Sequence, residues 1–243
     1  MKLYGLIGRP LKHSFSKRYF TEKFAKEGIT DCAYENFELE TIAQLTTISK
    51  AHPELRGLNV TIPYKKEVIP FLQTKNEIVE AIQACNCIKI DGDNWHGYNT
   101  DVIGFTQSLQ PLLKPHHQKA LVLGTGGSSN AVQYALQQLG LAYQLVSRQK
   151  SAATITYTEL DAAVLNDYTV IINTTPVGMF PNTDAAPDLP YHLLSSEHLL
   201  FDLIYNPEKT VFLQKGAERG AAIANGYAML LLQAEESWRI WNS

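Results

Sequence analysis

The sequence predicts an α/β protein made of two α/β domains. Short apolar runs alternate with amphipathic stretches of helical spacing from the N-terminus, and the same alternation begins again after residue 120. The pattern breaks after the hairpin-like stretch 86–99, and a helix-like stretch (101–113) that ends at Lys114-Pro115-His116-His117 precedes the second series. Alternation of this kind is typical of mainly parallel sheets covered by helices. We therefore expect two such domains, with a boundary near residue 100.

In the first half, the apolar runs have strand chemistry and the amphipathic runs have helical spacing. The expected elements are LYGLIG (3–8), FSKRYFTEKFAKEGI (15–29), AYENFEL (33–39), TIAQLTTISKA (41–51) and GLNVTI (57–62). Pro63 can open a helix, which YKKEV (64–68) is expected to begin. NCIKIDGDNWHGYN (86–99) differs, because two strand-like runs flank Asp91-Gly92-Asp93-Asn94, which has the composition of a hairpin turn.

The second half begins with a predicted helix, DVIGFTQSLQPLL (101–113), followed by a strand, a glycine turn and a helix in 120–140. Further strands are expected at YQLVS (143–147), YTVIINT (168–174), LLFDLI (199–204) and AAIAN (221–225). The chain closes with a long apolar-faced helix, GYAMLLLQAEESWRIW (226–241), which we expect to return to the first domain. The predicted domains are therefore 1–100 plus 226–243, and 101–225.

Size and charge narrow the class of protein. The chain has 243 residues, 45% of them apolar, and a formal charge of −3, and no Lys/Arg run marks a nucleic-acid surface. Three cysteines, Cys32, Cys85 and Cys87, lack metal-site spacing and are expected to be reduced thiols rather than a disulfide framework. No apolar run is long enough for a membrane span or a secretion signal. We expect a cytoplasmic protein with no metal, membrane or nucleic-acid partner.

A glycine turn lies between the strand and the helix in 120–140. Gly124, Gly126 and Gly127 follow the strand directly, in the place where backbone amides and a helix N-terminus can hold a pyrophosphate. The match to G-x-G-x-x-G is incomplete, because Ser129 occupies the last position, although Ala131 is small enough for close packing of helix and strand. An ordinary tight turn is the alternative interpretation.

The end of the next strand favours one dinucleotide over another. An NAD-binding strand normally ends in Asp or Glu, which binds the ribose 2′-hydroxyl. Here the end is Ser147-Arg148-Gln149-Lys150, without an acid. A guanidinium can pair with a 2′-phosphate, which a carboxylate would repel. The strand end therefore favours NADP, against the alternative of a solvated Arg and Lys on an exposed turn.

Several stretches in order resemble the shikimate dehydrogenase family. They are KHSFS (12–16), NVTIPYK (59–65), CNCI (85–88), GYNTD (97–101), the GTGG turn, the SRQK strand end, NTTPVGM (173–179), DLIYNP (202–207) and GYAMLLLQA (226–234). The resemblance implies an N-terminal substrate-binding domain and a Rossmann-like NADP-binding domain. It also implies NADPH-dependent, reversible reduction of 3-dehydroshikimate to shikimate, in aromatic amino-acid biosynthesis.

The resemblance implies that Lys65 and Asp101 are the catalytic pair. Addition of hydride to a carbonyl leaves negative charge on oxygen, which requires a nearby proton or cation. Lys65 can supply both, and Asp101 can hold its ammonium in place. If Lys65 is catalytic, Lys66 is left without a role in the reaction. The alternative is that Lys65 and Lys66 both lie on an exposed helix face.

Family positions for the substrate are also occupied by short polar side chains. Ser14 and Ser16 match those that hold the carboxylate, to which Tyr205 can add its hydroxyl, and Thr61, Asn86 and Gln233 match those that bind ring hydroxyls. Each has a structural alternative: the serines can be helix N-caps, Thr61 a strand residue and Asn86 a turn residue. His13 is interpreted as structural or solvated. The family usually has Pro where Lys17 stands and Thr where Cys87 stands, and Lys17 leaves the course of the serine loop open.

The cofactor positions implied by the family come from three segments of the second domain and from the final helix. They are Gly124, Gly126, Gly127 and Ser128 for the pyrophosphate, Ser147, Arg148 and Lys150 for the 2′-phosphate, Thr174 where the third strand end meets the cofactor, and Met229 where the final helix meets the nicotinamide. For residues 173–179 a plain exit from a strand into a loop is the alternative. Alternatives remain a quinate/shikimate dehydrogenase with broader substrate or NAD use, and a non-catalytic relative that senses NADP or ligand. The partner is expected to be a small molecule, and the protein a monomer or homodimer.

Overall fold

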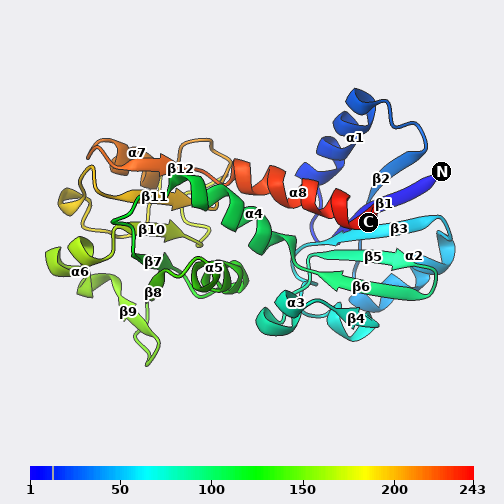
Figure 1. Cartoon of the computed structure of the whole chain (residues 1–243), viewed down its shortest axis with the longest axis horizontal. Helices are drawn as coiled ribbons and strands as arrows, with labels where there is room; N and C mark the ends of the chain where they lie inside the picture. Colours follow the sequence, from blue (N-terminus) through cyan, green and yellow to red (C-terminus); the bar gives the residue numbers. More distant parts are fainter. Residues whose placement is uncertain (13) are drawn as a thin grey trace. The chain divides into compact units, whose positions relative to one another are not determined.

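The computed structural model describes residues 1–12 and 14–243, and the chain forms two compact units. The first contains Met1–Thr100 and Ala234–Ser243, and the second contains Asp101–Gln233 (Figure 1). His13 lies outside the described residues, so its predicted role stays a prediction. No helix in the part of the chain that the structure describes is long and apolar enough to span a bilayer.

The first unit is built on a mixed six-stranded sheet. Its strands are β1 (Lys2–Gly8), β2 (Cys32–Glu38), β3 (Leu55–Val60), β4 (Thr74–Lys75), β5 (Cys87–Asp91) and β6 (Asn94–Tyr98). They are ordered β2-β1-β3-β5-β6-β4, with β1 parallel to β2 and β3, and β5 antiparallel to both β3 and β6. The predicted hairpin is present as β5 and β6. The carboxyl ends of β1, β3 and β6 and the amino end of β5 therefore share one edge of the sheet.

Helices cover both faces of this sheet. They are α1 (Phe15–Glu27), α2 (Leu45–Ala51) and α3 (Glu77–Ile82), with 3-10 turns at Ile42–Gln44 and Ile69–Phe71. Residues of β1 alternate between two cores: Leu3 and Ile7 pack with α2 and α3, whereas Tyr4 and Leu6 pack with α1. Period-two alternation of a strand explains this division.

The segment after β3 differs from the prediction. Residues 62–68 form successive turns instead of the expected helix. Tyr64 and Val68 are buried in the core, and the Tyr64 hydroxyl donates to the carbonyl of Leu39 at 2.7 Å. Tertiary packing of these two side chains therefore overrides the helical pattern of YKKEV, and Lys65 lies on a turn rather than at a helix start.

The second unit is built on an all-parallel six-stranded sheet. Its strands are β7 (Lys119–Leu123), β8 (Ala142–Ser147), β9 (Thr154–Thr156), β10 (Val170–Asn173), β11 (Leu199–Asp202) and β12 (Ala222–Ala224). They are ordered β12-β11-β10-β7-β8-β9. This is the strand order of a doubly wound dinucleotide-binding sheet, whose order reverses between β7 and β10.

The helices of the second unit are α4 (Thr100–Leu109), α5 (Gly127–Gln138), α6 (Ala162–Asp167) and α7 (Val211–Ala217), with 3-10 turns at Gln110–Leu112, Tyr157–Glu159 and Tyr191–Leu193. The final helix, α8 (Tyr227–Trp241), contributes residues to both units, and its end packs Trp238 and Trp241 against Tyr4 of β1. The predicted α/β class, with a Rossmann-like second half and a C-terminal helix that returns to the first, is confirmed.

Candidate functional site

The glycine turn joins β7 to α5. Gly124 has φ = 101°, and a Cβ there would lie 2.8 Å from Cγ2 of Thr175, so the position requires glycine. A Cβ at Gly126 or Gly127 would meet no atom within 4 Å, so both glycines face open space. Gly126 is the N-cap of α5, and no side chain in the described part of the chain caps this helix, which leaves its first amides to a ligand or to water. An anion can bind there.

A pocket of about 770 Å³ lies at the point where the strand order reverses. It is formed after the carboxyl ends of β7, β8 and β10, and Gly124, Gly126, Ser147, Arg148 and Thr174 all line it. The Thr174 hydroxyl donates to the carbonyl of Leu123 at 2.6 Å and so ties the segment after β10 to β7. The volume and position are those of a dinucleotide site in this fold.

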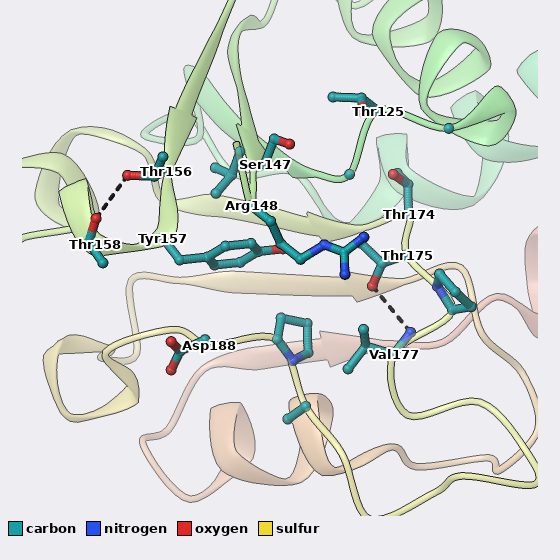
Figure 2. Close-up of a pocket in the computed structure, with 16 residues that line it drawn as sticks. Thr125, Ser147, Arg148, Thr156, Tyr157, Thr158, Thr174, Thr175, Val177 and Asp188 are labelled. Atoms are coloured by element: carbon teal, nitrogen blue, oxygen red, sulfur yellow. Dashed lines mark hydrogen bonds between the residues drawn. The ribbon is translucent and has the colours of Figure 1, made fainter. Parts of the chain in front are cut away.

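Arg148 is the cation of this pocket. It follows β8 directly, and Figure 2 shows its side chain stretched across the pocket between the ring of Tyr157 and Thr175. No other Lys or Arg occurs among the described residues that line the pocket, and Asp188 is the one acid among them. The positive charge at the end of β8 suits a phosphate on the ribose.

Lys150 does not line the pocket. Its ammonium pairs with the carboxylate of Glu159, which also accepts from the backbone and the hydroxyl of Thr156 at 2.8 and 2.9 Å. Lys150, then Thr156, hold the pKa of Glu159 down at about 2. In this structure Lys150 therefore neutralises Glu159, and its predicted contact with a 2′-phosphate stays a prediction.

The other predicted cofactor residues lie outside the pocket lining. Gly127 and Ser128 are exposed at the first turn of α5, next to Gly126. Met229 is half-buried on α8, and its carbonyl would lie 2.6 Å from a Cβ at Gly104, so α4 and α8 pack closely there.

Sequence reasoning missed one wall of the pocket. Thr156, Tyr157 and Thr158 line it from the end of β9, and Ala186, Pro187 and Asp188 line it from the long segment after β10. β9 has only three residues, so its apolar pattern is too short to be recognised. The dipeptide Tyr157-Thr158 carries no phosphate-binding signature of its own.

In the first unit, predicted substrate residues gather at one edge of the sheet. Thr61 follows β3, and Asn86 precedes β5. The Val60 amide donates to the carbonyl of Asn86 at 2.9 Å, and the Cys85 amide donates to the carbonyl of Lys65 at 2.8 Å. Thr61, Lys65 and Asn86 are therefore brought together by backbone hydrogen bonds. Lys65 is half-buried and Lys66 is exposed.

The amide of Asn86 is fixed by Thr100. Its Oδ1 accepts from the Thr100 amide at 2.6 Å, and its Nδ2 donates to the Thr100 hydroxyl at 3.0 Å. Asn86 is 3% exposed, so the turn-residue alternative does not describe it: the side chain holds the start of α4. Asp101, the next residue, begins the second unit.

The two serines lie at the start of α1, after the carboxyl end of β1. Ser14 is the N-cap residue, but its hydroxyl makes no capping bond, and Oγ is buried without a hydrogen-bond partner among the described residues. Ser16 is half-buried on α1, and the hydroxyl of the buried Tyr34 donates to Oδ1 of Asn59 at 2.8 Å. Lys17 pairs with Glu35 at 2.5 Å. A buried hydroxyl without a partner is costly, and a ligand oxygen would satisfy it.

The remaining predicted residues belong to the second unit. Tyr205 is 38% exposed and follows β11, and Gln233 is half-buried on α8, where its Nε2 donates to the carbonyl of Leu230 at 3.0 Å. Among the described residues no cluster of His, Cys, Asp and Glu is arranged for a metal ion, and the three cysteines are free thiols.

Comparison with known proteins agrees with these features. The family described as "Shikimate dehydrogenase substrate binding domain" matches residues 6–88. Shikimate dehydrogenase (NADP(+)) of Caldicellulosiruptor saccharolyticus is 35% identical, over 99% of this chain and 91% of that protein. The crystal structure of shikimate dehydrogenase from Aquifex aeolicus has a TM-score of 0.87 and 34% identity, covering 100% of this chain and 92% of its own.

A third comparison involves a liganded structure. Shikimate 5-dehydrogenase from Thermus thermophilus, in complex with NADP(H) and shikimate, has a TM-score of 0.87 and 27% identity, covering 99% of this chain and 93% of its own. A full-length relative above 30% identity leaves one conclusion about this protein: the chain belongs to the shikimate dehydrogenase family.

Proposed function

We propose that the protein catalyses the reversible, NADPH-dependent reduction of 3-dehydroshikimate to shikimate, in aromatic amino-acid biosynthesis. Family membership supports the reaction. The observation that carries the cofactor preference is the pocket at the strand-order reversal, where Arg148 follows β8 and no acid ends that strand. A carboxylate at this point would favour NAD, whereas the guanidinium favours the 2′-phosphate of NADP.

The residues of the second unit fit the cofactor. Gly124 permits the tight turn, and Gly126, Gly127 and Ser128 would present the uncapped start of α5 to the pyrophosphate. Ser147 and Arg148 would bind the 2′-phosphate, while Lys150 would act on it indirectly, by neutralising Glu159. Thr174 lines the same pocket, and Met229 stays a proposed contact of the nicotinamide. NADPH, when bound, supplies the hydride.

Lys65 and Asp101 are the proposed catalytic pair. The ammonium of Lys65 would stabilise the negative charge that develops on the substrate carbonyl oxygen, and would deliver the proton that completes the hydroxyl. Asp101 would orient that ammonium. In the reverse direction Lys65 accepts the proton from the shikimate hydroxyl.

The proposed substrate residues carry hydroxyl and amide groups, which suit a ligand with one carboxylate and three hydroxyls. The buried Ser14 hydroxyl has no hydrogen-bond partner among residues 1–12 and 14–243, so a carboxylate oxygen would satisfy it, and Ser16 and Tyr205 are proposed to share this task. Thr61, Asn86 and Gln233 are proposed to bind the ring hydroxyls. An amide carries two N–H donors, and Asn86 gives one to Thr100, so the second can serve the substrate.

The test is a spectrophotometric assay of nicotinamide reduction, with shikimate and quinate each tried against NADP⁺ and NAD⁺. We expect turnover of shikimate with NADP⁺. Arg148→Ala should lower kcat/KM for NADP⁺ by about 10- to 100-fold, since a charge-assisted hydrogen bond is lost, and should change the value for NAD⁺ much less.

Arg219→Ala is the matched control, because Arg219 is an exposed arginine of the same unit that does not line the pocket. Absence of turnover with either substrate would favour the non-catalytic alternative, and equal turnover of quinate would establish the broader activity. An equal loss for both cofactors in Arg148→Ala would refute the 2′-phosphate role.

A further inference from the structure

Asp202 is a buried carboxylate at the carboxyl end of β11 that the proposed chemistry does not use. The residue is 0% exposed, and among the described residues no Lys or Arg pairs with it. Burial raises its pKa to about 6. A carboxylate in this position is costly unless its oxygens accept several hydrogen bonds.

Three segments donate to this carboxylate. Oδ1 accepts from Nδ2 of Asn173 at 3.0 Å and from the amide of Ile204 at 3.1 Å, and Oδ2 accepts from the hydroxyl of Thr210 at 2.6 Å. Asn173 ends β10, Ile204 follows β11, and Thr210 caps α7. One side chain therefore joins the ends of two neighbouring strands and the start of a helix.

The link through Asn173 reaches the cofactor pocket. Oδ1 of Asn173 accepts from the amide of Thr175 at 3.0 Å and from its hydroxyl at 2.6 Å, and the Thr175 hydroxyl accepts from the amide of Val177 at 3.3 Å. Thr175 and Val177 both line the pocket, where Figure 2 shows the last of these bonds. Asn173 is itself fully buried. Bulk water therefore cannot take the place of Asp202 as the acceptor for its side-chain amide.

The link through Ile204 reaches the segment that carries Tyr205. The Leu203 amide donates to the carbonyl of Asn173 at 3.0 Å, and the Gly226 amide donates to the carbonyl of Ile204 at 3.1 Å. A Cβ at Gly226 would lie 2.1 Å from the Leu203 carbonyl oxygen, so the chain is closely packed here. The backbone next to Tyr205 is thus held in place by the hydrogen bond between the Ile204 amide and the Asp202 carboxylate.

We propose that Asp202 is a positioning residue that holds the cofactor-binding segment after β10 and the Tyr205 segment after β11 for the binding of both ligands. The proposal rests on the proposed function, in which Tyr205 binds the substrate. The physical basis is that the two oxygens of one carboxylate accept hydrogen bonds from three segments of the chain. These bonds restrict the movement of each segment relative to the other two.

The test compares Asp202→Ala with Asp202→Asn. Alanine leaves all three donors without an acceptor, so we expect the Kd of NADP⁺ and the KM of shikimate to rise by about tenfold or more. Asparagine keeps an oxygen for Asn173 and Ile204, and its amide can donate to the Thr210 hydroxyl, which also accepts. Asp202→Asn should therefore stay within about threefold of the wild type for both constants.

Asn173→Ala separates the two links. It cuts the path to Thr175 and leaves Ile204 bound to Asp202, so the Kd of NADP⁺, measured by calorimetry, should rise by about tenfold while the KM of shikimate changes less than about twofold. Leu165→Ala is the control for lost stability, because Leu165 is fully buried on α6. Its carbonyl hydrogen-bonds to His198, which precedes the amino end of β11, whereas Asp202 lies at the carboxyl end of that strand. It should leave both constants unchanged.

Folded Asp202→Ala with both constants within about twofold of the wild type would overturn the proposal, as would an equal rise of both constants in Leu165→Ala. If Asp202→Ala does not fold, Asn173→Ala decides: a rise in both constants or in neither contradicts it. Because NADP⁺ binding is measured without turnover, a wild type that binds NADP⁺ but does not oxidise shikimate refutes the proposed function and leaves the Asn173 link testable.

Discussion

At the scale of single residues, two carboxylates of the second unit have pKa values that move in opposite directions. The Lys150 ammonium and the donors of Thr156 lower the pKa of Glu159 to about 2, whereas burial raises the pKa of Asp202 to about 6. Glu159 lies at the surface beside a cation, and Asp202 lies in the core with neutral donors only. Both groups are carboxyls, so the opposite directions of their pKa shifts come from their surroundings.

The raised pKa of Asp202 predicts a pH dependence of stability. Between its ordinary pKa near 4 and about 6, the folded state holds the proton more strongly than the unfolded state. The Asp202 contribution is therefore largest below pH 4 and is lost as pH rises through 6, by roughly 2–3 kcal/mol in the free energy of unfolding.

Chemical denaturation of the wild type and Asp202→Asn at several pH values measures this contribution. The difference in free energy of unfolding should shift in favour of Asp202→Asn as pH rises from 4 to 7. A difference that is constant with pH would show that Asp202 titrates alike in both states. His117 does not disturb the comparison: burial lowers its pKa and its contribution falls with acid, but it is present in both proteins.

Family positions could be assigned from the sequence where the residues are contiguous with a motif. Arg148 follows its strand directly, and the structure places it in the pocket. The environment of Lys150 could not be predicted, because Glu159, its partner, comes nine residues later, after β9. Asp202 lies inside the DLIYNP motif, but its buried contacts with Asn173 and Thr210 depend on strand neighbours that the sequence does not reveal.

At the scale of elements, long periodic segments were predictable and short ones were not. The parallel strands of the second unit and the hairpin of β5 and β6 follow from apolar runs and turn residues. The segment 62–68 forms turns instead of a helix because Tyr64 and Val68 are drawn into the core. β9 and the 3-10 turn after it are too short to leave a pattern.

The end of α8 depends on a close contact with β3. A Cβ at Gly57 would lie 2.3 Å from Nε1 of Trp241, which donates to the carbonyl of Ile88 at 2.9 Å and stacks on Tyr4 at 4.8 Å. Gly57→Ala should therefore lower the free energy of unfolding by about 1–3 kcal/mol, because overpacking displaces the indole.

Denaturant unfolding of a double-mutant cycle checks this contact. In a Trp241→Ala background no ring remains beside position 57, so Gly57→Ala should cost less than in the wild type. The same cost in both backgrounds would mean that Gly57 does not limit the approach of α8.

At the scale of the whole molecule, the proposed reaction needs groups from both units. Lys65 and the serines belong to Met1–Thr100, whereas the cofactor pocket, Tyr205 and Gln233 belong to Asp101–Gln233. Asp101 is the first residue of the second unit, and α8 supplies residues to both. Neither unit alone carries the complete proposed set, so the proposed reaction requires the intact chain.

The most direct test of this account is the turnover of Lys65→Ala, measured with shikimate and NADP⁺ alongside shikimate binding by calorimetry. Removal of the proton donor should lower kcat by about 10²- to 10⁴-fold while shikimate still binds, and Lys66→Ala, at the exposed neighbour, should keep kcat within about twofold. A Lys65→Ala protein that turns over shikimate at a near-normal rate would contradict the proposed mechanism.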